Sequence, residues 1–410
     1  MNVDRIVVVG GGLGGAKAVE ALREKGFHGS LVLVGAEDEL PYERPPLSKG
    51  YLLGKDDFDS ARVHPREWYD EHGVELRLGT PATAVDRDAR QVVLGTGERL
   101  GYDLLVLATG SVPRLLPLPG ADLDGALTLR YHGDSDRLRA AFTPGAHVVV
   151  IGGGWIGLEA AAAARQAGSE VTVLERERLP LLQVLGPEVA QVFADLHAEH
   201  GVDIRTGVDV AELVGQDGSV RAVRLRDGAE LPADVVLVGV GAAPAVQLAE
   251  QAGLDVANGV LVDAQLRTSD PRVFAVGDIA NAVHPVLGER VRVEHWANAL
   301  NQPAVAAGVM LGGDDVYDLL PYFYTDQYDL GMEYVGHVGQ GGYDRVVFRG
   351  DVPGRELIAF WLRRGAVVAG MNVNVWDVVD DIKEIIAAGP DVDVEKLADP
   401  DVPLREVIRR

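Results

Sequence analysis

The chain has 410 residues, of which 47% are hydrophobic and 24% charged, and its formal net charge is −24. This length allows about two to four domains with large cores. The acidic balance excludes nucleic acid and anionic membranes as main partners, because both would be repelled at long range. The absence of cysteine excludes disulfides, thiolate catalysis and cysteine-held iron–sulfur clusters.

The first predicted elements form a strand–turn–helix–strand unit. Residues 5–9 (RIVVV) are a β-branched run typical of a buried parallel strand. Glycines follow, and a helical period from Lys17 to Lys25 ends at Gly26. Residues 30–34 (SLVLV) are the next strand. The start has neither the basic region nor the long apolar stretch of a signal peptide, so we expect a cytoplasmic protein without membrane association.

The same unit returns about a third of the chain later. It comprises a strand at 147–151 (HVVVI), glycines at 152–157, an alanine-rich helix at 158–166 and a strand at 170–174 (EVTVL). Three more short apolar runs end in small residues and are also predicted strands, namely 104–108, 235–240 and 273–276.

The last part of the chain, from about Pro321, has a different character. Alternating stretches at 345–349 and 357–362 predict strands, and Arg364-Gly365 predicts a hairpin turn leading into 367–371. A helix at 378–388 is expected to precede a solvated acidic tail. We interpret this region as a separate α+β domain. The tail's acidic residues are Asp391, Asp393, Glu395, Asp399 and Asp401.

Both glycine turns fit the pattern G-x-G-x-x-G between a strand and a helix. The first glycine allows the tight turn, the second lets a pyrophosphate approach the backbone, and the third allows close helix–strand packing. The helix N-terminus offers free N–H groups to the phosphates. The pattern glycines are Gly10, Gly12 and Gly15 in the first copy and Gly152, Gly154 and Gly157 in the second.

An acidic residue after the second strand of such a unit can bind the ribose hydroxyls. Glu175 has this position in the second copy, which favours NADH over NADPH, although Arg176 and Arg178 could accept a 2′-phosphate. In the first copy Glu37 follows the strand with a displaced spacing. Two dinucleotide turns in one chain are most simply explained by FAD and NAD(P)H, between which a hydride passes.

The stretch from Gly35 to Leu53 (GAEDELPYERPPLSKGYLL) strongly resembles the FAD-dependent ferredoxin reductases of bacterial oxygenase systems, and it is also similar to apoptosis-inducing factor. The likeness extends through the chain, at Ala108–Gly110 (ATG), Gly241 with Pro244, Phe274–Asp278 (FAVGD), Trp296–Ala299 with Gln302, and Tyr324–Tyr328 (YTDQY).

The resemblance implies an α/β fold like that of glutathione reductase, with two Rossmann-like dinucleotide-binding domains and a C-terminal α+β interface domain. The implied domains are an FAD-binding domain in two segments (1–113 and 245–320), an NAD-binding domain (114–244) and the interface domain (321–410).

The resemblance also implies roles for individual positions. Gly14 would join the turn glycines at the FAD pyrophosphate, and Asp278 would bind the ribityl chain. Lys49 and Glu159 would form a catalytic pair near the flavin and the nicotinamide. Without the resemblance, Lys49 could equally be an exposed surface lysine, and Glu159 an acid that the helix dipole favours in the first turn of its helix. The other positions implied to bind a cofactor are Arg44, Ala82, Thr109, Gly110, Arg130, Gly241, Gly277 and Trp296.

The leading hypothesis is an NADH-dependent reductase that passes electrons through FAD to a [2Fe–2S] ferredoxin, which serves a cytochrome P450 or a ring-hydroxylating oxygenase. The lack of cysteine favours it over disulfide reductases. A redox-sensing protein like apoptosis-inducing factor and a reductase of a quinone or other small acceptor remain alternatives. His197 and His200 have no further ligand at metal spacing, so we expect no metal site.

Three departures from the family pattern concern the electron acceptor. Ferredoxins are usually acidic, so this acidic chain needs a local basic patch. Tyr322 and Tyr324 stand where family members often carry tryptophan, and residues 370–375 (GMNVNV) are unfamiliar in these reductases. The candidates for the basic patch are Arg44, Lys49, Arg62, Arg66, Arg290 and Arg292.

Overall fold

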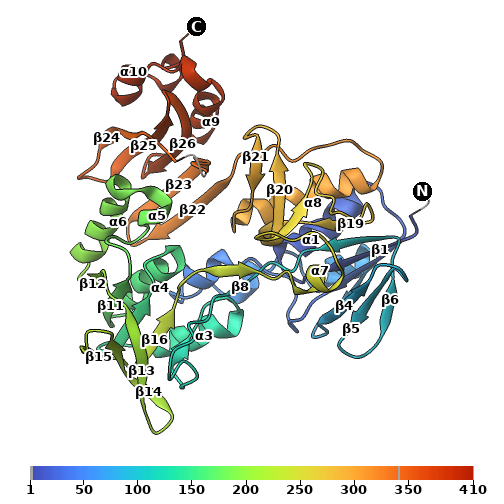
Figure 1. The fold of residues 1–410 in the computed structure, drawn as a ribbon, viewed down its shortest axis with the longest axis horizontal. Helices are drawn as coiled ribbons and strands as arrows, with labels where there is room; N and C mark the ends of the chain where they lie inside the picture. The colour runs from blue at the N-terminus through green and yellow to red at the C-terminus, as the bar shows by residue number, and fades with distance from the viewer. Residues whose placement is uncertain (1–2, 340–341, 410) are drawn as a thin grey trace. The chain divides into compact units, whose positions relative to one another are not determined.

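The computed structural model describes residues 3–339 and 342–409, which divide into two compact units (Figure 1). Each unit is assembled from three stretches of the chain. The first unit consists of Met1–Glu43, Phe58–Val112 and Ala243–Pro321, and the second of Arg44–Asp57, Pro113–Ala242 and Tyr322–Arg410.

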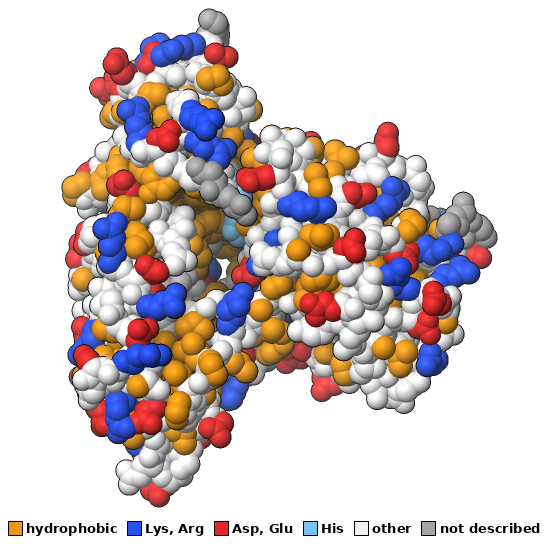
Figure 2. Space-filling view, in the orientation of Figure 1, with side chains coloured by type: hydrophobic (Ala, Val, Ile, Leu, Met, Phe, Trp, Pro, Cys, Tyr) orange, Lys and Arg blue, Asp and Glu red, His pale blue; other side chains and the backbone are white. Residues whose placement is uncertain are grey.

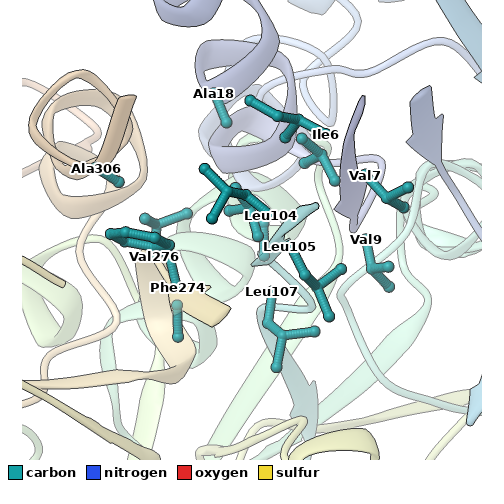
Figure 3. Packing of buried hydrophobic residues seen from close by; sticks show 14 of the residues in the cluster. Ile6, Val7, Val9, Ala18, Leu104, Leu105, Leu107, Phe274, Val276 and Ala306 are labelled. Carbon is teal, nitrogen blue, oxygen red and sulfur yellow. The ribbon is translucent and has the colours of Figure 1, made fainter. Parts of the chain in front are cut away.

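A five-stranded parallel sheet forms the centre of the first unit. Helices α1 (Leu13–Glu24) and α8 (Trp296–Met310) pack against one another beside it. Figure 3 shows β-branched and leucine side chains of neighbouring strands packed together, with Ala18 of α1 and Ala306 of α8 close by. Such continuous apolar strands are expected where both faces of a parallel sheet are covered. The strand order is β19 (Val273–Ala275), β7 (Leu104–Leu107), β1 (Arg5–Val9), β2 (Ser30–Val34), β3 (Val74–Arg77).

Smaller elements complete the first unit. An antiparallel meander, β4 (Ala82–Asp86), β5 (Gln91–Leu94) and β6 (Arg99–Gly101), separates β3 from β7 in the sequence. A second small sheet contains β18 (Val260–Val262), β20 (Ala280–His284) and β21 (Glu289–Val291). The helical elements are α2 (Arg66–Glu71), α7 (Gln247–Gln251), η2 (Phe58–Ala61) and η3 (Gly277–Ile279). Two short strands, β8 (Ser111–Pro113) and β17 (Ala242–Pro244), pair with one another in a separate two-stranded sheet.

The second unit contains another five-stranded parallel sheet. Four of its strands repeat the order of the first sheet, and the fifth, β9 (Ala126–Leu127), precedes them in the sequence, whereas β19 follows the others in the first unit. A meander lies between β12 (Asp203–Thr206) and β16 (Val235–Val238) in the sequence, as one lies between β3 and β7 in the first unit. It consists of β13 (Val210–Gln216), β14 (Ser219–Leu225) and β15 (Glu230–Pro232). The sheet order is β12 (Asp203–Thr206), β11 (Glu170–Glu175), β10 (His147–Ile151), β16 (Val235–Val238), β9 (Ala126–Leu127). The helical elements are η1 (Pro45–Ser48), α3 (His132–Ala141), α4 (Trp155–Gln166), α5 (Leu182–Leu185) and α6 (Pro187–Glu199).

The two parallel sheets repeat one arrangement down to single hydrogen bonds. Arg23, in the last turn of α1, donates to the carbonyl oxygen of His72 at 2.7 Å. Arg165, in the last turn of α4, donates to the carbonyl oxygen of His200 at 2.8 Å. Each histidine ends the helix that leads into an edge strand of its sheet, β3 in the first unit and β12 in the second. The predicted duplication of the strand–turn–helix–strand unit is therefore confirmed.

The C-terminal stretch of the second unit forms an antiparallel sheet flanked by helices. In Figure 1 helix α9 (Val379–Ala387) covers β23 and β26, and α10 (Val394–Ala398) contacts β24. Arg364 and Gly365 both have positive φ, 52° and 82°, and form the predicted hairpin turn between β25 and β26. The sheet order is β22 (Tyr322–Gln327), β23 (Leu330–Gly336), β26 (Ala366–Val373), β25 (Glu356–Arg363), β24 (Arg345–Asp351).

Four of the five acidic residues of the expected tail are exposed, as predicted, and Asp393 is half-buried, but the segment is folded. It contains η4 (Gly389–Asp391), α10 and η5 (Leu404–Glu406). Asp393 caps α10 by accepting hydrogen bonds from two backbone N–H groups. Leu397 and Val407 are fully buried, and the Arg349 side chain donates to the carbonyl oxygens of Asp399 and Pro400 at 2.5 and 3.1 Å.

Helices α1 and α4 begin earlier than predicted, at Leu13 and Trp155 instead of Lys17 and Leu158. The last glycine of each turn belongs to the helix, because it must pack closely on the preceding strand. Among residues 3–339 and 342–409, no helix combines the length and hydrophobicity that crossing a bilayer requires.

Candidate functional site

The predicted cofactor-binding residues of the first unit gather at one edge of its parallel sheet. The chain leaves β1 towards β2 and later enters β7 on the other side of β1, so the crevice between β1 and β7 is a topological switch point. Nucleotides bind at such points, beyond the carboxyl ends of the strands. The residues at this edge are Gly10–Gly15 after β1, Glu37 after β2, Thr109 and Gly110 after β7, and Gly277 and Asp278 after β19.

The glycines of the first turn have different surroundings. Gly10 has a φ of +130°, and a Cβ atom there would lie 2.1 Å from the carbonyl oxygen of Ala108. A Cβ atom on Gly15 would lie 1.9 Å from the carbonyl oxygen of Gly10. A Cβ atom on Gly12 would meet no neighbouring atom of the described chain within 4 Å. The outer glycines are therefore required by the fold, whereas the middle one leaves a space that a pyrophosphate can fill.

The second turn repeats this pattern. A Cβ atom on Gly152 would lie 2.5 Å from the carbonyl oxygen of Gly239, and one on Gly157 would lie 2.1 Å from that of Gly152. At Gly154 the space is again open for 4 Å with respect to the residues that the structure describes. Both turns therefore fit a dinucleotide pyrophosphate, with backbone N–H groups of the following helix as its donors.

Glu175 ends β11 beside the second turn. Its Oε2 atom accepts a hydrogen bond from the Gly153 backbone at 2.7 Å, and its Oε1 atom accepts one from the Glu177 backbone at 2.8 Å. The carboxylate is therefore fixed next to the turn, where an adenosine ribose would lie. Arg176 and Arg178 are exposed on the same loop. Side chains suited to a 2′-phosphate therefore lie close to the carboxylate suited to a ribose, as the sequence indicated.

Asp278 and Gly277 are held from two sides. The Ser111 hydroxyl donates to Asp278 Oδ2 at 2.6 Å, and the Gly277 backbone N–H donates to Gln302 Oε1 at 2.8 Å. Gly277 has a φ of +78°, which favours glycine. The carboxylate thus has a defined orientation at the sheet edge.

The remaining predicted residues of the first unit also have partners. Thr109 Oγ1 donates to the carbonyl oxygen of Ala245 at 2.7 Å, and Trp296, the first residue of α8, donates through Nε1 to Glu43 at 3.0 Å. The Tyr42 hydroxyl donates to Glu37 at 2.5 Å. Gly14 is buried in α1, and Ala82 begins β4.

Lys49 and Glu159 form the predicted pair, in the second unit. Lys49 Nζ lies 2.7 Å from Glu159 Oε1, and the side chains are 15% and 3% exposed. Lys49 follows η1, whose prolines restrict the backbone before it. Its ammonium also lies 5.4 Å from the ring centre of Tyr324. A buried ion pair of this kind needs further hydrogen bonds to offset its desolvation.

Those hydrogen bonds come from residues that the sequence analysis did not select. The hydroxyls of Ser48 and Thr325 both donate to the Glu159 carboxylate. Thr325 entered the sequence comparison only as part of YTDQY. The available signal was its alternation with Tyr322 and Tyr324 on β22, which puts it on the opposite face of the strand. Burial raises the pKa of the neighbouring Asp326, an effect that Lys49 opposes and Glu159 reinforces.

Three further predicted residues lie in the second unit. Arg44 Nη1 donates to the carbonyl oxygen of Arg130 at 2.5 Å. Gly241 has a φ of +102°, and its carbonyl oxygen accepts from the Arg114 backbone at 2.9 Å. No group of three His, Asp or Glu residues suited to a metal ion occurs within residues 3–339 and 342–409.

Sheet topology, open glycine turns and an acid at the end of the second strand together define a chain with two dinucleotide-binding units. Residues 4–302 match the family described as pyridine nucleotide-disulphide oxidoreductase, and residues 322–408 match the family described as reductase C-terminal. The chain belongs to the pyridine nucleotide-disulphide oxidoreductase family. Because it has no cysteine, it cannot use the redox disulfide in that family's name.

Relatives similar to this chain are reductases of oxygenase systems. The chain is 42% identical to the ferredoxin–NAD(+) reductase component of the anthranilate 1,2-dioxygenase system of Burkholderia cepacia, over 99% of both chains. It is 38% identical to putidaredoxin reductase of Pseudomonas putida, over 99% of this chain and 97% of that protein. These relatives confirm the resemblance inferred from the sequence.

Solved structures agree with the sequence comparison. The reductase in the covalent putidaredoxin reductase–putidaredoxin complex has a TM-score of 0.93 at 37% identity, with 98% of each chain covered. The ferredoxin reductase for the CYP199A2 system of Rhodopseudomonas palustris has a TM-score of 0.91 at 36% identity, covering 99% of this chain and all of that one. The predicted fold class, two Rossmann-like domains with a C-terminal α+β region, is confirmed.

Proposed function

We propose that this protein takes a hydride from NADH onto bound FAD and passes the electrons to a [2Fe–2S] ferredoxin, which supplies a cytochrome P450 or a ring-hydroxylating oxygenase. The observation that carries the proposal is the duplicated glycine turn, open at Gly12 and at Gly154, in a chain without cysteine. Two dinucleotides fit such a chain, and no thiol competes for the electrons.

The first unit is the proposed FAD-binding domain. Its turn glycines would bind the pyrophosphate through backbone N–H groups, and Asp278, oriented by Ser111, would accept hydrogen bonds from ribityl hydroxyls. When bound, FAD supplies the conversion of a two-electron hydride into single electrons. Glu37, Ala82, Thr109, Gly110, Gly277 and Trp296 are proposed to contribute from the same unit.

The sheet of the second unit is the proposed NADH-binding domain, and the stretch from residue 321 the interface domain. Gly152, Gly154 and Gly157 would hold the pyrophosphate, and Glu175 the adenosine ribose, with Gly241 beside the turn. A carboxylate repels a 2′-phosphate, so NADH is favoured over NADPH. Arg44, Lys49 and Arg130, which belong to the second unit, are retained as proposed FAD contacts.

The pair of Lys49 and Glu159 is proposed to order the reaction site. Glu159 is buried and accepts from Lys49 at 2.7 Å, which restricts the position of the ammonium group. A fixed cation stabilises negative charge that develops on a nearby group during hydride transfer. No side-chain proton donor is needed for this step, because the hydride brings a hydrogen nucleus together with both electrons.

The proposed partner is a ferredoxin, because the relatives named above are ferredoxin and putidaredoxin reductases. On the face shown in Figure 2, basic and acidic side chains are interspersed, without one large patch of either sign. Arg290 donates to the carbonyl oxygens of Val262 and Asn281 at 2.9 and 2.8 Å, and Arg292 pairs with Glu294 at 2.8 Å. Of the remaining candidate basic residues, Arg62 and Arg66 are exposed. Arg62 pairs with Asp59 at 3.1 Å, so Arg66, at the start of α2, is the proposed docking residue.

The deciding experiment is NADH-driven reduction of cytochrome c by the purified FAD-loaded protein, with and without an added [2Fe–2S] ferredoxin. The proposal predicts a large ferredoxin-dependent increase in rate. Equal rates without ferredoxin would point to a small acceptor such as a quinone, and negligible rates with several ferredoxins to a redox-sensing protein. Because its electron donor is NADH, we place the proposed activity in the cytoplasm.

A further inference from the structure

A chain of buried hydrogen bonds connects Glu159 to helix α6. Thr325 Oγ1 donates to Glu159 Oε1 at 2.5 Å, and Gln327 Nε2 donates to Thr325 Oγ1 at 3.2 Å. Gln327 Oε1 lies 2.8 Å from His197 Nε2, and His197 Nδ1 lies 3.5 Å from the Tyr328 hydroxyl. Glu159, Thr325, Gln327 and His197 are each at most 4% exposed.

Every link of this chain has the same direction. A carboxylate oxygen only accepts, so the Thr325 hydroxyl must donate to Glu159 and accept from the amide nitrogen of Gln327. The amide oxygen of Gln327 must then accept from an N–H group on His197 Nε2. Burial lowers the pKa of His197 to about 4, so the ring is neutral at pH 7 and its Nδ1 atom is left as an acceptor.

We propose that Thr325 is a positioning residue for the reductase reaction, and that Gln327 and His197 act through it to hold the Glu159 carboxylate and thereby Lys49 in place. The inference rests on the proposed function, because it assigns these residues to the same reaction site. It adds three residues on β22 and α6 to the pair formed by Lys49 and Glu159.

The duplicated architecture gives an internal comparison. Glu159 stands two residues after the last glycine of the second turn, and Lys17 has the same position after the first turn. Lys17 is 23% exposed and pairs with Glu20 at 2.8 Å. Helix α1 packs on its sheet without a buried acid at this position, so the strand–turn–helix arrangement does not require one. The buried acid and its donors therefore belong to the reaction site.

The chain of hydrogen bonds from His197 to Glu159 orients the Glu159 carboxylate and does not conduct protons to it. A proton relay needs groups that both accept and release a proton along the path, and the amide nitrogen of Gln327 is only a donor. What the chain can do is select one rotamer of the Thr325 hydroxyl and one position of the carboxylate. A small misplacement of a group that orders a reaction site can lower its rate by about ten- to a hundredfold.

The test compares Thr325→Val, which removes the hydroxyl with little change of shape, with Thr325→Ser, which keeps it. NADH is mixed anaerobically with the FAD-loaded protein, and the limiting rate of flavin bleaching is separated from the dissociation constant of NADH. We expect Thr325→Val to lower the rate at least about tenfold with a dissociation constant within about twofold, and Thr325→Ser to stay within about threefold.

A matched control is Ser169→Ala. Ser169 is fully buried in the second unit and donates to the carbonyl oxygen of Thr143 at 3.0 Å. This variant therefore loses a comparable buried hydrogen bond that is not part of the series from His197 to Glu159. Its rate should stay within about twofold of the wild type. Equal losses in Thr325→Val and Ser169→Ala would show general destabilisation and would overturn the proposal.

A double-mutant comparison tests whether Gln327 acts through Thr325. Gln327→Met should slow flavin bleaching in the wild-type background, but should add less than about twofold once Thr325→Val is present. Losses that multiply in the double variant would show that Gln327 acts independently, and would contradict the proposed chain.

A second readout does not depend on catalysis. In ¹⁵N spectra of histidine-labelled holoprotein, His197 should be neutral at pH 6 with its proton on Nε2. A neutral ring that carries its proton on Nδ1 and none on Nε2 would show that the links do not have the proposed direction. If the wild type itself fails to reduce its FAD with NADH, the proposed function fails; if it succeeds and Thr325→Val matches Thr325→Ser, only this inference fails.

Discussion

Replacing Gly12 or Gly15 by alanine adds one methyl group to the same turn, yet the structure predicts opposite outcomes. A Cβ atom on Gly15 would lie 1.9 Å from the Gly10 carbonyl oxygen, so α1 would have to move away from β1 by about 1 Å or more. We expect Gly15→Ala to cost more than about 3 kcal/mol of unfolding free energy. The apoprotein would then unfold at clearly lower urea concentration.

Gly12→Ala should leave the fold almost unchanged. Gly12 has φ −94° and ψ −168°, a conformation open to alanine, and its Cβ atom would meet no described atom within 4 Å. The loss of a glycine N-cap costs at most about 1 kcal/mol. The added methyl group would occupy the space proposed for the pyrophosphate, so we expect purified Gly12→Ala protein to contain little FAD.

The second turn supplies the matched pair. Gly157→Ala should destabilise like Gly15→Ala, since its Cβ atom would lie 2.1 Å from the carbonyl oxygen of Gly152. Gly154→Ala should keep normal stability and normal FAD content but bind NADH at least about tenfold more weakly. The measurements are urea unfolding of the apoproteins, flavin absorbance per chain, and titration with NADH.

The reasoning would be refuted if Gly154→Ala lost FAD while Gly12→Ala retained it, because the two nucleotides would then occupy the other units. It would also be refuted if the variants within one turn were equally stable. In that case the close contacts of Gly15 and Gly157 would not restrain the packing of their helices.

Four further outcomes are expected. Glu175→Ala combined with Glu177→Arg should raise kcat/KM for NADPH relative to NADH at least about tenfold, and an unchanged preference would remove Glu175 from the ribose. Asp278→Ala should lower the FAD content per chain more than Ser111→Ala does, and full retention would argue against a ribityl contact. Burial lowers the pKa of His197 to about 4, below its unfolded value of about 6.5, so the unfolded state binds more protons between these two pH values. The unfolding free energy of the wild type should therefore fall by about 2 kcal/mol from pH 7 to pH 5 through this residue. In urea unfolding at several pH values, His197→Gln should remove this fall, and an unchanged fall would show that another group is responsible. The Arg349 guanidinium group donates hydrogen bonds to the carbonyl oxygens of Asp399 and Pro400. Arg349→Met should therefore lower the unfolding free energy in urea by about 2 to 4 kcal/mol and make the C-terminal segment sensitive to protease. Unchanged protease resistance would contradict that role.

The glycine turns and their flanking strands were predictable from the sequence because their chemistry is local. A β-branched run, three glycines at fixed spacing and an alanine-rich stretch determine one turn and its neighbours. The hairpin at Arg364-Gly365 was predictable for the same reason, since two consecutive residues with positive φ define its turn type.

The surroundings of Glu159 were not predictable in this way. Its donors come from η1 and from β22, which precede and follow α4 by more than a hundred residues. Only the fold shows that Thr325 bonds to Glu159 on α4 and Gln327 to His197 on α6, while Tyr324 lies on the other face of the strand. The exposure of the acidic residues near the C-terminus was predictable, but the folding of their segment was not, because apolar residues such as Leu397 and Val407 find their partners only in the folded C-terminal region.

The basic residues illustrate a further limit of sequence reasoning. Arg290 was a docking candidate by its charge alone, but its guanidinium group bonds to carbonyl oxygens of Val262 and Asn281. Arginine has five N–H donors and often satisfies backbone acceptors, so its presence in a sequence does not indicate a free cation.

The interleaving of the two units has a consequence for synthesis on the ribosome. Strand β7 of the first unit ends at Leu107, whereas its neighbour β19 begins only at Val273, after every strand of the second unit's parallel sheet has been made. At about 5 to 20 residues per second, the intervening stretch of about 165 residues takes roughly 8 to 33 s to translate. During that time the backbone N–H and C=O groups on this edge of the apolar strand β7 have no strand to pair with. The nascent chain is then prone to aggregation, and chaperones can bind it.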